Sequence, residues 1–358
     1  MKKFFIILSA IISAITVSAQ KIEWLETTHD FGVFYEEDGN KTCTMRFVNV
    51  GEKPLTILSA RASCGCTQPK YPREAIAPGD TAAIEITYMP AGRPGRFDKT
   101  VNIVTNAYNE NKSKINIKGV VVGSSATVNA HYPHNAGALR LKFQTALIEE
   151  IRKNKTKTVF IDAYNVSRDT IYPEWDNLPE YITVSSGTKF VAPGDYISFA
   201  INFSAFKCPE YGLVKNNILL YPDGKERSTP FAVEVAATIM DDFSNLTDDQ
   251  RMKAPVLTAN PKKLSLGIIA PPNGLNASFT ITNNGKSDLI IRRIYANVPY
   301  INIKYKKTRV KPGKSIEVEV TLNPFALPQD IINTYIYIAS NYPDNPLMEY
   351  RVVGDIAK

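Results

Sequence analysis

The sequence has little of the chemistry on which enzymes depend. Only three His occur among 358 residues, so a Ser-His-Asp triad would need His29, His131 or His134, and none of these lies in a recognisable context. The chain contains no Gly-x-Ser-x-Gly, His-Glu-x-x-His, P-loop or dinucleotide-binding motif. Its acidic pairs fall in turns and linkers, where nothing predicts the cleft that glycosidase carboxylates require. We therefore predict no catalytic residues, no enzymatic activity and no cofactor.

Cysteine and excess charge are also scarce. Four Cys are too few to hold a chain of this length by disulfides, so hydrophobic cores must stabilise it, and 44% hydrophobic residues are ample for that. The formal net charge is +7, which is mild and does not by itself indicate nucleic acid as a partner. We therefore predict no nucleic-acid binding.

Only one apolar run approaches the length of a membrane helix, and it lies at the N-terminus. Lys2 and Lys3 precede an apolar stretch from Phe4 to Val17, and Val17-Ser18-Ala19 then forms a small-residue cleavage pattern. This pattern predicts a secretory signal peptide over residues 1–19. The alternative is a membrane anchor, but a spanning helix needs roughly 20 apolar residues. We expect an exported protein, periplasmic or at the cell surface, that does not span the membrane after signal cleavage.

Two turn landmarks recur three times in the same order, which indicates an internal repeat. The first is an Asn at a strand end, at Asn49, Asn165 and Asn283, and the second is a Pro-Gly pair beginning at Pro78, Pro193 and Pro312. From Asn to Pro the spacing is 29, 28 and 29 residues. We interpret the Asn-x-Gly segments as turns that use a positive φ, and Pro-Gly as a turn that presets one residue and frees the next.

An alternating apolar run follows each Pro-Gly pair, as in a half-buried strand. These runs are Ala82, Ile84, Ile86 and Tyr88; Ile197, Phe199, Ile201 and Phe203; and Ile316, Val318, Val320 and Leu322. Two further strand-like runs close each repeat, which gives about seven short strands per ~100 residues. The predicted fold class is all-β, with three tandem immunoglobulin-like β-sandwich domains after the signal peptide. A barrel is the alternative, but it would not need three equal copies.

The landmarks also divide the chain. After the signal peptide at 1–19, we expect a first domain at 20–123, a second at 124–241, a linker at 242–254 and a third domain at 255–358. Residues 145–153 (TALIEEIRK) look locally helical, although tertiary context can override such a propensity. Asp248-Asp249 predicts a helical turn in the linker.

The first repeat carries a resemblance to a known family. His29-Asp30-Phe31-Gly32-Val33, residues 46–51 (RFVNVG), Ser63-Cys64-Gly65-Cys66-Thr67 and Ala77-Pro78-Gly79-Asp80 resemble the bacterial DUF1573 family. That family is common in exported proteins of Bacteroidota and is similar to immunoglobulin-like modules of the ASPM–SPD-2–Hydin type. The resemblance implies fold and export but no established activity. It covers the first repeat only, because the other two repeats keep the turns and lack Cys-Gly-Cys.

Cys64-Gly65-Cys66 is the sharpest local feature, and it has two interpretations. As free thiols the two Cys would form a redox pair or part of a soft-metal site, since thiolates select Cu(I) or Zn. A metal site needs three or four ligands, and the nearby candidates are only Cys43 and His29. We favour a structural role, in which Cys43 faces the core either as a buried thiol or in a bridge to Cys64 or Cys66 that leaves one thiol over. A disulfide directly across Cys-x-Cys would be strained and easily reduced.

A basic run leads into the third Pro-Gly turn. It contains Lys304, Lys306, Lys307, Arg309 and Lys311. One interpretation is a binding patch for an anionic polymer such as a cell-wall glycan or lipopolysaccharide. The other, which we favour, is a solvated edge strand that Lys protects from pairing with other chains.

Three further features have weaker interpretations. His131 and His134 could ligate a metal on a helix, but Pro133 argues against a helix, so we favour an interdomain contact. Trp175 lies between Pro173 and Pro179, a loop-like setting that could display it to a glycan. We expect Trp24 to pack in the core.

Together these features predict a non-catalytic, exported, multi-domain protein that acts as a scaffold or as a binding or adhesion module in the bacterial envelope. Its expected partners are an envelope protein or a glycan. The alternative is a thiol-redox or copper-binding periplasmic protein that acts through Cys64-Gly65-Cys66.

Overall fold

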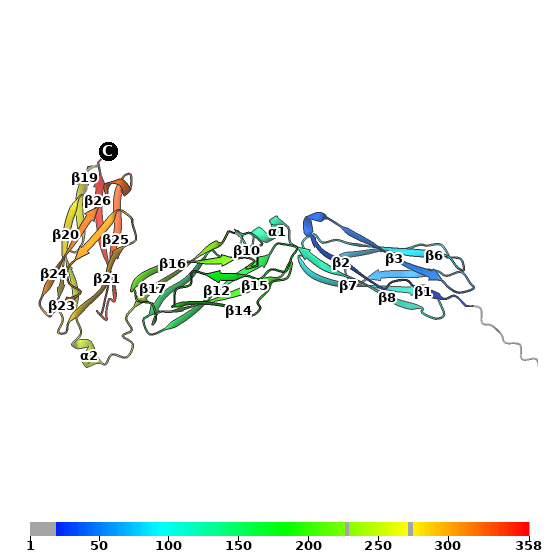
Figure 1. Ribbon diagram of the computed structural model, residues 1–358, viewed down its shortest axis with the longest axis horizontal. Coiled ribbons are helices and arrows are strands. Elements are labelled where there is room, and N and C mark those ends of the chain that lie inside the picture. Colours follow the sequence, from blue (N-terminus) through cyan, green and yellow to red (C-terminus); the bar gives the residue numbers. More distant parts are fainter. Residues whose placement is uncertain (1–18, 226–228, 271–274, 358) are drawn as a thin grey trace, which may run out of the picture. The chain divides into compact units, whose positions relative to one another are not determined.

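The computed structural model describes residues 19–225, 229–270 and 275–357, and it confirms the all-β prediction (Figure 1). Six sheets pair into three immunoglobulin-like β-sandwiches, taken in order along the sequence. The chain also divides into two compact units. One holds the described residues up to 131 together with 164–170 and 191–196, and the other holds the remainder. The predicted signal peptide falls almost wholly outside the described residues, and the predicted domain boundaries stay predictions.

The first sandwich contains strands β1 to β8, blue to cyan in Figure 1. Their bounds are β1 Ile22–Trp24, β2 Thr28–Tyr35, β3 Lys41–Asn49, β4 Ile57–Ala62, β5 Thr67–Lys70, β6 Thr81–Tyr88, β7 Gly95–Thr105 and β8 Lys112–Val122, with a short 3-10 helix η1 at Glu36–Asp38. One sheet has the order β1-β3-β6-β5 and the other β2-β8-β7-β4. Ile84, Ile86 and Tyr88 of β6 are buried, as the alternation predicts.

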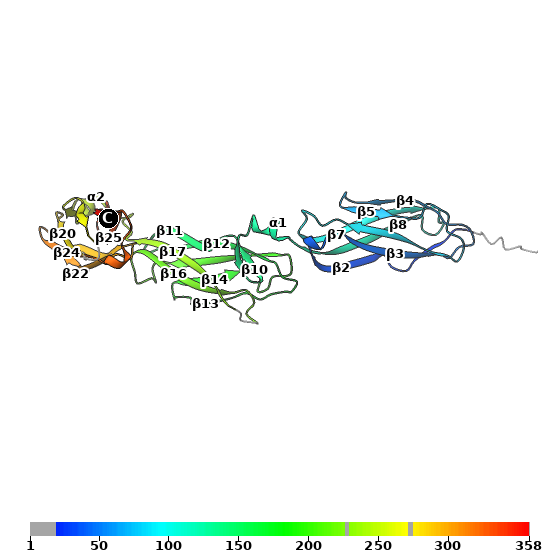
Figure 2. The ribbon, with the colours of Figure 1, turned by 90° about the horizontal axis from the view of Figure 1, so that it is seen from above.

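The second sandwich contains strands β9 to β17, and Figure 2 shows β13 at its margin. The bounds are α1 Ser125–Asn129, β9 His134–Ala136, β10 Leu139–Leu141, β11 Thr145–Arg152, β12 Thr156–Asn165, β13 Glu174–Asp176, β14 Ile182–Ser186, β15 Tyr196–Ser204, β16 Gly212–Tyr221 and β17 Phe231–Met240. Its sheets have the orders β14-β15-β12-β10-β9 and β11-β17-β16-β13. The alternating residues of β15, from Ile197 to Phe203, are all buried.

The third sandwich contains strands β18 to β26. The bounds are α2 Asp248–Met252, β18 Leu257–Asn260, β19 Leu264–Ile269, β20 Asn276–Asn283, β21 Leu289–Ala296, β22 Ile301–Tyr305, β23 Arg309–Val310, β24 Ser315–Leu322, η2 Pro324–Ala326, β25 Ile331–Ser340 and β26 Leu347–Ile356. Its sheets have the orders β18-β20-β24-β22 and β19-β26-β25-β21-β23. Helix α2 confirms the helical turn predicted at Asp248-Asp249, where Thr247 caps the first turn.

The three sandwiches share one topology. In each, one of the first three strands of the repeat pairs in parallel with the last strand, as β2 with β8, β11 with β17 and β19 with β26. The other strand pairs within these sheets are antiparallel where their register is described. This match confirms that the repeated landmarks reflect a repeated fold.

The recurring Asn residues explain the constant spacing between the landmarks. Asn49, Asn165 and Asn283 are fully buried, and the backbone N–H of Gly79, Gly194 and Gly313 donates to their respective carbonyl oxygens. Each Asn Nδ2 also donates to two backbone carbonyls, one of them the residue two positions before the Pro-Gly pair: Ile76, Val191 and Val310. Because each side chain ties together two turns that are remote in sequence, we call these residues the turn-bridging asparagines.

The glycine two residues after the turn-bridging asparagine, present in the first and third repeats, has a different role from the one predicted. A positive φ occurs at the Pro-Gly turns but not at Gly51 or Gly285. A Cβ added at Gly51 would meet the backbone of Ala19 and Lys21, and one at Gly285 would meet the backbone of Ala254 and Val256. The prediction of a positive-φ turn was therefore wrong at these two positions, where glycine allows a close approach of two backbone segments.

The helical propensity of residues 145–153 was also misleading, because this segment forms β11. Ala146, Ile148 and Ile151 are buried and pack into the sandwich. Their spacing of two and then three residues arises from a bulge between Leu147 and Glu149, where Glu149 has a φ of 63°. The bulge interrupts the period of two, so the sequence pattern does not read as a strand.

Candidate functional site

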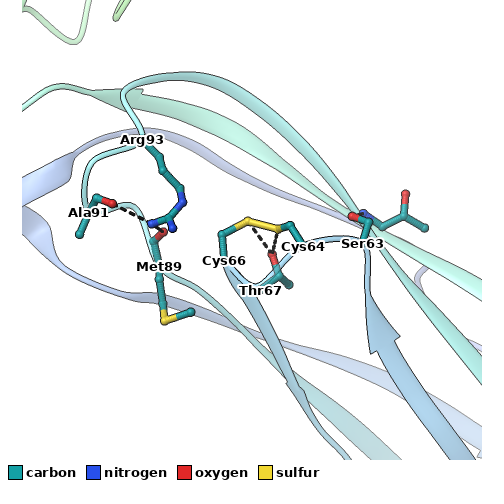
Figure 3. The surroundings of a disulfide bond; sticks show 8 residues. Ser63, Cys64, Cys66, Thr67, Met89, Ala91 and Arg93 are labelled. Carbon is teal, nitrogen blue, oxygen red and sulfur yellow. Dashed lines mark hydrogen bonds between the residues drawn. A yellow bond between two sulfur atoms is a disulfide. The ribbon is translucent and has the colours of Figure 1, made fainter.

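A disulfide joins Cys64 and Cys66 in the connection between β4 and β5 (Figure 3). The two Cα atoms are 5.3 Å apart, and one residue, Gly65, separates the cysteines. Cys66 is buried in the core of the first sandwich, whereas Cys64 is half-buried. The bond therefore lies at the boundary between core and solvent.

The predicted bridge from Cys43 to Cys64 or Cys66 does not form. Cys43 is a free thiol, as is Cys208. In the sheet, Cys43 of β3 is opposite Ile86 of β6, and Ile86 is opposite Pro69 of β5. Two strand spacings of about 4.8 Å each thus separate β3 from β5, beyond the roughly 7 Å that a disulfide spans between Cα atoms. Burial, reinforced by the charge of Glu26, raises the pKa of the Cys43 thiol to about 11.

Polar groups surround the disulfide on the β5–β6 side. The Thr67 hydroxyl oxygen lies 3.7 Å from Cys64 Sγ and 3.8 Å from Cys66 Sγ. The Met89 N–H donates to the Cys66 carbonyl at 2.9 Å. The Arg93 guanidinium donates to the carbonyls of Ala91, at 2.7 Å, and Met89, at 3.4 Å (Figure 3). The segment that follows β6 therefore contacts Cys66 through Met89 and also carries the cationic side chain of Arg93.

The basic run predicted from the sequence lies at an open sheet edge. Strand β22 is the last strand of its sheet, which agrees with the prediction of an edge strand. It pairs with β24 only from Val318 to Leu322, so residues 315–317 of β24 lack a second strand partner among the described residues. A pocket of about 350 Å³ lies there, which we call the edge pocket. It is lined by Lys304, Tyr305, Lys306, Lys307, Ser315, Ile316, Glu317 and Glu319.

The basic residues of this run differ in their electrostatic surroundings. Lys304 is opposite Glu319 in the sheet register, and Arg309 is paired with Asp288 at 2.6 Å. Within the described part of the chain, no carboxylate lies within ion-pair distance of Lys306, Lys307 or Lys311. The structure thus brings Lys304, Lys306 and Lys307 to the edge pocket, while Arg309 is neutralised and Lys311 does not line the pocket.

Positive charge is concentrated in the third repeat, a feature that the whole-chain net charge conceals. Residues 255–358 contain thirteen Lys and Arg and seven Asp and Glu, a net charge of +6 out of the +7 of the whole chain. Counting charge by repeat would have revealed this asymmetry from the sequence.

Trp175 is not in the loop that its flanking prolines suggested. It lies in the edge strand β13 and packs edge-on against Phe199, with ring centroids 5.2 Å apart. Its ring N–H is buried and has no hydrogen-bond partner among the described residues. Trp24 is half-buried, packs against the core residue Phe47 and donates to the Ser113 hydroxyl, so the predicted packing is confirmed at the margin of the core.

The described residues hold no cluster of metal ligands. Within residues 19–225, 229–270 and 275–357, no three His, Cys, Asp or Glu side chains are grouped as a metal site would require. The interdomain role predicted for His131 and His134 stays a prediction. In the same residues, no helix is long and apolar enough to cross a bilayer.

The chain belongs to the DUF1573 family of proteins of unknown function, which it matches over residues 22–121 and 257–355. The resemblance seen in the first repeat therefore extends to the third, although the third lacks Cys-Gly-Cys. No protein among the curated ones matches the chain.

Solved structures resemble the chain in fold. A protein of unknown function from Porphyromonas gingivalis W83 has 17% sequence identity and a TM-score of 0.51, over 61% of this chain and 100% of that protein. A three-domain titin fragment, an E-to-A variant of domains I67–I69, has 9% identity and a TM-score of 0.27, over 95% of this chain and 98% of the fragment. The first of these supports the sandwich fold and no particular activity.

Proposed function

We propose that this protein is an exported, non-catalytic binding module of the bacterial envelope, and that its third sandwich binds an anionic glycan at the edge pocket. The observation that carries the proposal is an open sheet edge beside Lys306 and Lys307, for which no carboxylate lies within ion-pair distance among the described residues. A scaffold or adhesion role in the envelope would follow from such binding.

The charge distribution supports an anionic ligand. Lys306 and Lys307 are exposed and form no ion pair within the part of the chain that the structure describes, and the third repeat holds +6 of the chain's net charge. A surface of one sign attracts a polymer of the opposite sign over about a Debye length, roughly 10 Å at 0.1 M salt. The ligand should therefore bind more weakly as the salt concentration rises.

The shape and lining of the edge pocket support a sugar polymer. Tyr305 is half-buried and Ile316 is buried, so the pocket offers an apolar surface beside its charged rim. An aromatic ring presents a flat apolar surface for the C–H groups of a pyranose, while Lys306 and Lys307 can pair with its carboxylates. Glu317 and Glu319 provide acceptors for sugar hydroxyls.

The test measures binding of alginate, a polymer of uronic acids, to the mature protein by isothermal titration calorimetry, with uncharged dextran as the ligand control. The variant Lys304→Gln/Lys306→Gln/Lys307→Gln removes three charges at the edge pocket. The matched control, Lys262→Gln/Lys263→Gln/Lys286→Gln, removes three charges from other exposed positions of the same sandwich.

An exposed lysine contributes about 0.5–1 kcal/mol to such binding, so the pocket variant should bind alginate roughly 10–100-fold more weakly. The control variant should lose less than about threefold, because its lysines act only through the long-range field. Equal losses in the two variants, or equal binding of dextran and alginate, would contradict the proposal.

A further inference from the structure

We propose that the Cys64–Cys66 disulfide is a thiol–disulfide exchange site, which a dithiol reduces while the first sandwich stays folded. This inference is independent of glycan binding and concerns a different sandwich. It rests on where the disulfide lies, what it joins and which polar group faces it.

The disulfide does not staple the fold together. It joins two residues of one short connection, separated by Gly65 alone, so it constrains almost no chain in the unfolded state. The third sandwich has the same topology, and its connection between β21 and β22 contains no Cys. A sandwich of this family therefore closes this connection without a covalent bond.

The two cysteines differ in exposure, from which we infer the direction of attack. Cys64 is half-buried, whereas Cys66 is 5% exposed and packs in the core. An incoming thiolate can reach Cys64 Sγ, and Cys66 Sγ is then the leaving group. Exchange is faster when the leaving thiolate is stabilised.

Thr67 is placed to stabilise that thiolate. The residue is only 4% exposed, and the partners of its hydroxyl among the described residues are the two sulfurs, at 3.7 and 3.8 Å. A disulfide sulfur is a weak acceptor, so this buried hydroxyl is poorly satisfied in the oxidised protein. A Cys66 thiolate would accept a charge-assisted hydrogen bond from it.

Arg93 adds positive charge on the same side. Its guanidinium donates to the carbonyl of Met89, and the N–H of Met89 donates to the carbonyl of Cys66. A fixed cation near a cysteine favours its thiolate form. We therefore expect the charge of Arg93 to stabilise the Cys66 thiolate, without contact between Arg93 and the incoming thiol.

Reduction of the disulfide proceeds through a mixed disulfide and transfers two electrons. A thiolate of the reducing dithiol attacks Cys64 Sγ and forms a mixed disulfide, and the Cys64–Cys66 bond breaks with its electron pair on Cys66 Sγ. The second thiolate of the dithiol then attacks the dithiol sulfur that is bonded to Cys64 Sγ and releases the Cys64 thiolate. The dithiol loses two electrons and becomes a disulfide, while Cys64 and Cys66 gain two electrons and take up the two protons.

Cys43 stands outside this exchange. Two strand spacings separate β3 from β5, and burial holds its thiol in the protonated form at neutral pH. The reduced first sandwich thus has two reactive thiols and one inert thiol, which gives the experiment an internal reference.

The experiment equilibrates the folded mature protein with mixtures of reduced and oxidised dithiothreitol, quenches with N-ethylmaleimide and maps the adducts by mass spectrometry. Circular dichroism and hydrogen exchange of β3 and β6 report whether the sandwich stays folded. We expect Cys64 and Cys66 to be modified together, with Cys43 unmodified and the exchange protection of Ile84 and Ile86 retained.

The variant Thr67→Val removes the hydroxyl and keeps the shape. Thr87→Val is its control, because the Thr87 hydroxyl is bonded to the Thr42 hydroxyl and, among the described residues, to neither sulfur. We expect Thr67→Val to slow reduction about tenfold and to move the pH midpoint of maleimide labelling of the reduced protein upward, since a hydrogen bond to a charged group is lost. Thr87→Val should change neither quantity.

Reduction that occurs only after the first sandwich unfolds would overturn the proposal, as would labelling of Cys43 in step with Cys64. An unchanged pH midpoint in Thr67→Val would overturn the role of Thr67. Alginate binding should be the same in the oxidised and reduced protein, so failure of the exchange proposal and failure of the glycan proposal are distinguishable.

Discussion

Because each turn-bridging asparagine ties together two turns that are remote in sequence, we predict that its side chain stabilises a whole sandwich. Asn283 Nδ2 donates to the carbonyls of Ser287 and Val310 at 2.8 and 2.9 Å, and its Oδ1 accepts from the N–H of Gly285 at 3.0 Å. A longer contact of 3.3 Å comes from the N–H of Val256. The substitution Asn283→Ala removes all of these bonds at once.

The expected cost follows from the number and burial of these bonds. Each of the three short bonds contributes about 1 kcal/mol net, and the buried Val310 carbonyl is left without its partner, so the third sandwich should lose about 3 kcal/mol of stability. Because each 1.4 kcal/mol is tenfold, the slowest-exchanging amides of this sandwich should exchange roughly 150-fold faster.

Hydrogen exchange with mass spectrometry is the assay, since it reports each sandwich separately in the intact protein. Amides of β24 and β25 should accelerate, while those of β6 and β16 serve as internal references. The matched variant is Asn284→Ala, whose side chain is exposed and donates to the Thr258 hydroxyl at 2.8 Å. It should change exchange by less than about threefold. An Asn283→Ala protein that exchanges no faster than Asn284→Ala would refute the reasoning.

Two further outcomes follow from the fold. Glu149 has a positive φ at the bulge of β11, where the first and third sandwiches have Gly32 and Gly267. Glu149→Gly should therefore stabilise the second sandwich by about 1 kcal/mol, measured by hydrogen exchange of β17. A loss of stability would contradict this reasoning. Burial raises the pKa of the Cys43 thiol to about 11, so as the pH rises this thiol ionises in the unfolded chain before it ionises in the folded protein, and the first sandwich should lose stability above pH 9 in urea titrations. Cys43→Val should reduce that loss, while the part that comes from Tyr88, whose pKa burial also raises, should remain.

Much of the fold could be predicted because the signals were local or repeated. The Asn and Pro-Gly landmarks recur at constant spacing since each asparagine is hydrogen-bonded to its Pro-Gly turn. The alternation of residues 316–322 predicts the buried face of β24 directly. By contrast, β11 pairs in parallel with β17, about 90 residues away, and its bulge disguises the strand period, so no local signal identifies it.

The candidate sites were harder to predict because they depend on register. The sequence places Cys43 on a core-facing position, but only the strand order β3-β6-β5 shows that it lies too far from Cys64 and Cys66 to bridge them. Likewise, the basic run gives no hint that Arg309 is neutralised by Asp288, or that β24 leaves an open edge beside Lys306 and Lys307. Both sites are therefore formed by residues that are distant in sequence and adjacent in space.

The most direct test of the binding proposal is lysine footprinting of the mature protein with and without alginate. Sulfo-N-hydroxysuccinimide acetate modifies exposed lysines, and mass spectrometry gives the rate at each position. Bound alginate should protect Lys304, Lys306 and Lys307 at least about fivefold at 50 mM salt, and leave Lys262 and Lys263 unchanged, because direct contact excludes the reagent while a diffuse field does not. Equal protection of all exposed lysines, or none at the edge pocket, would contradict the proposal.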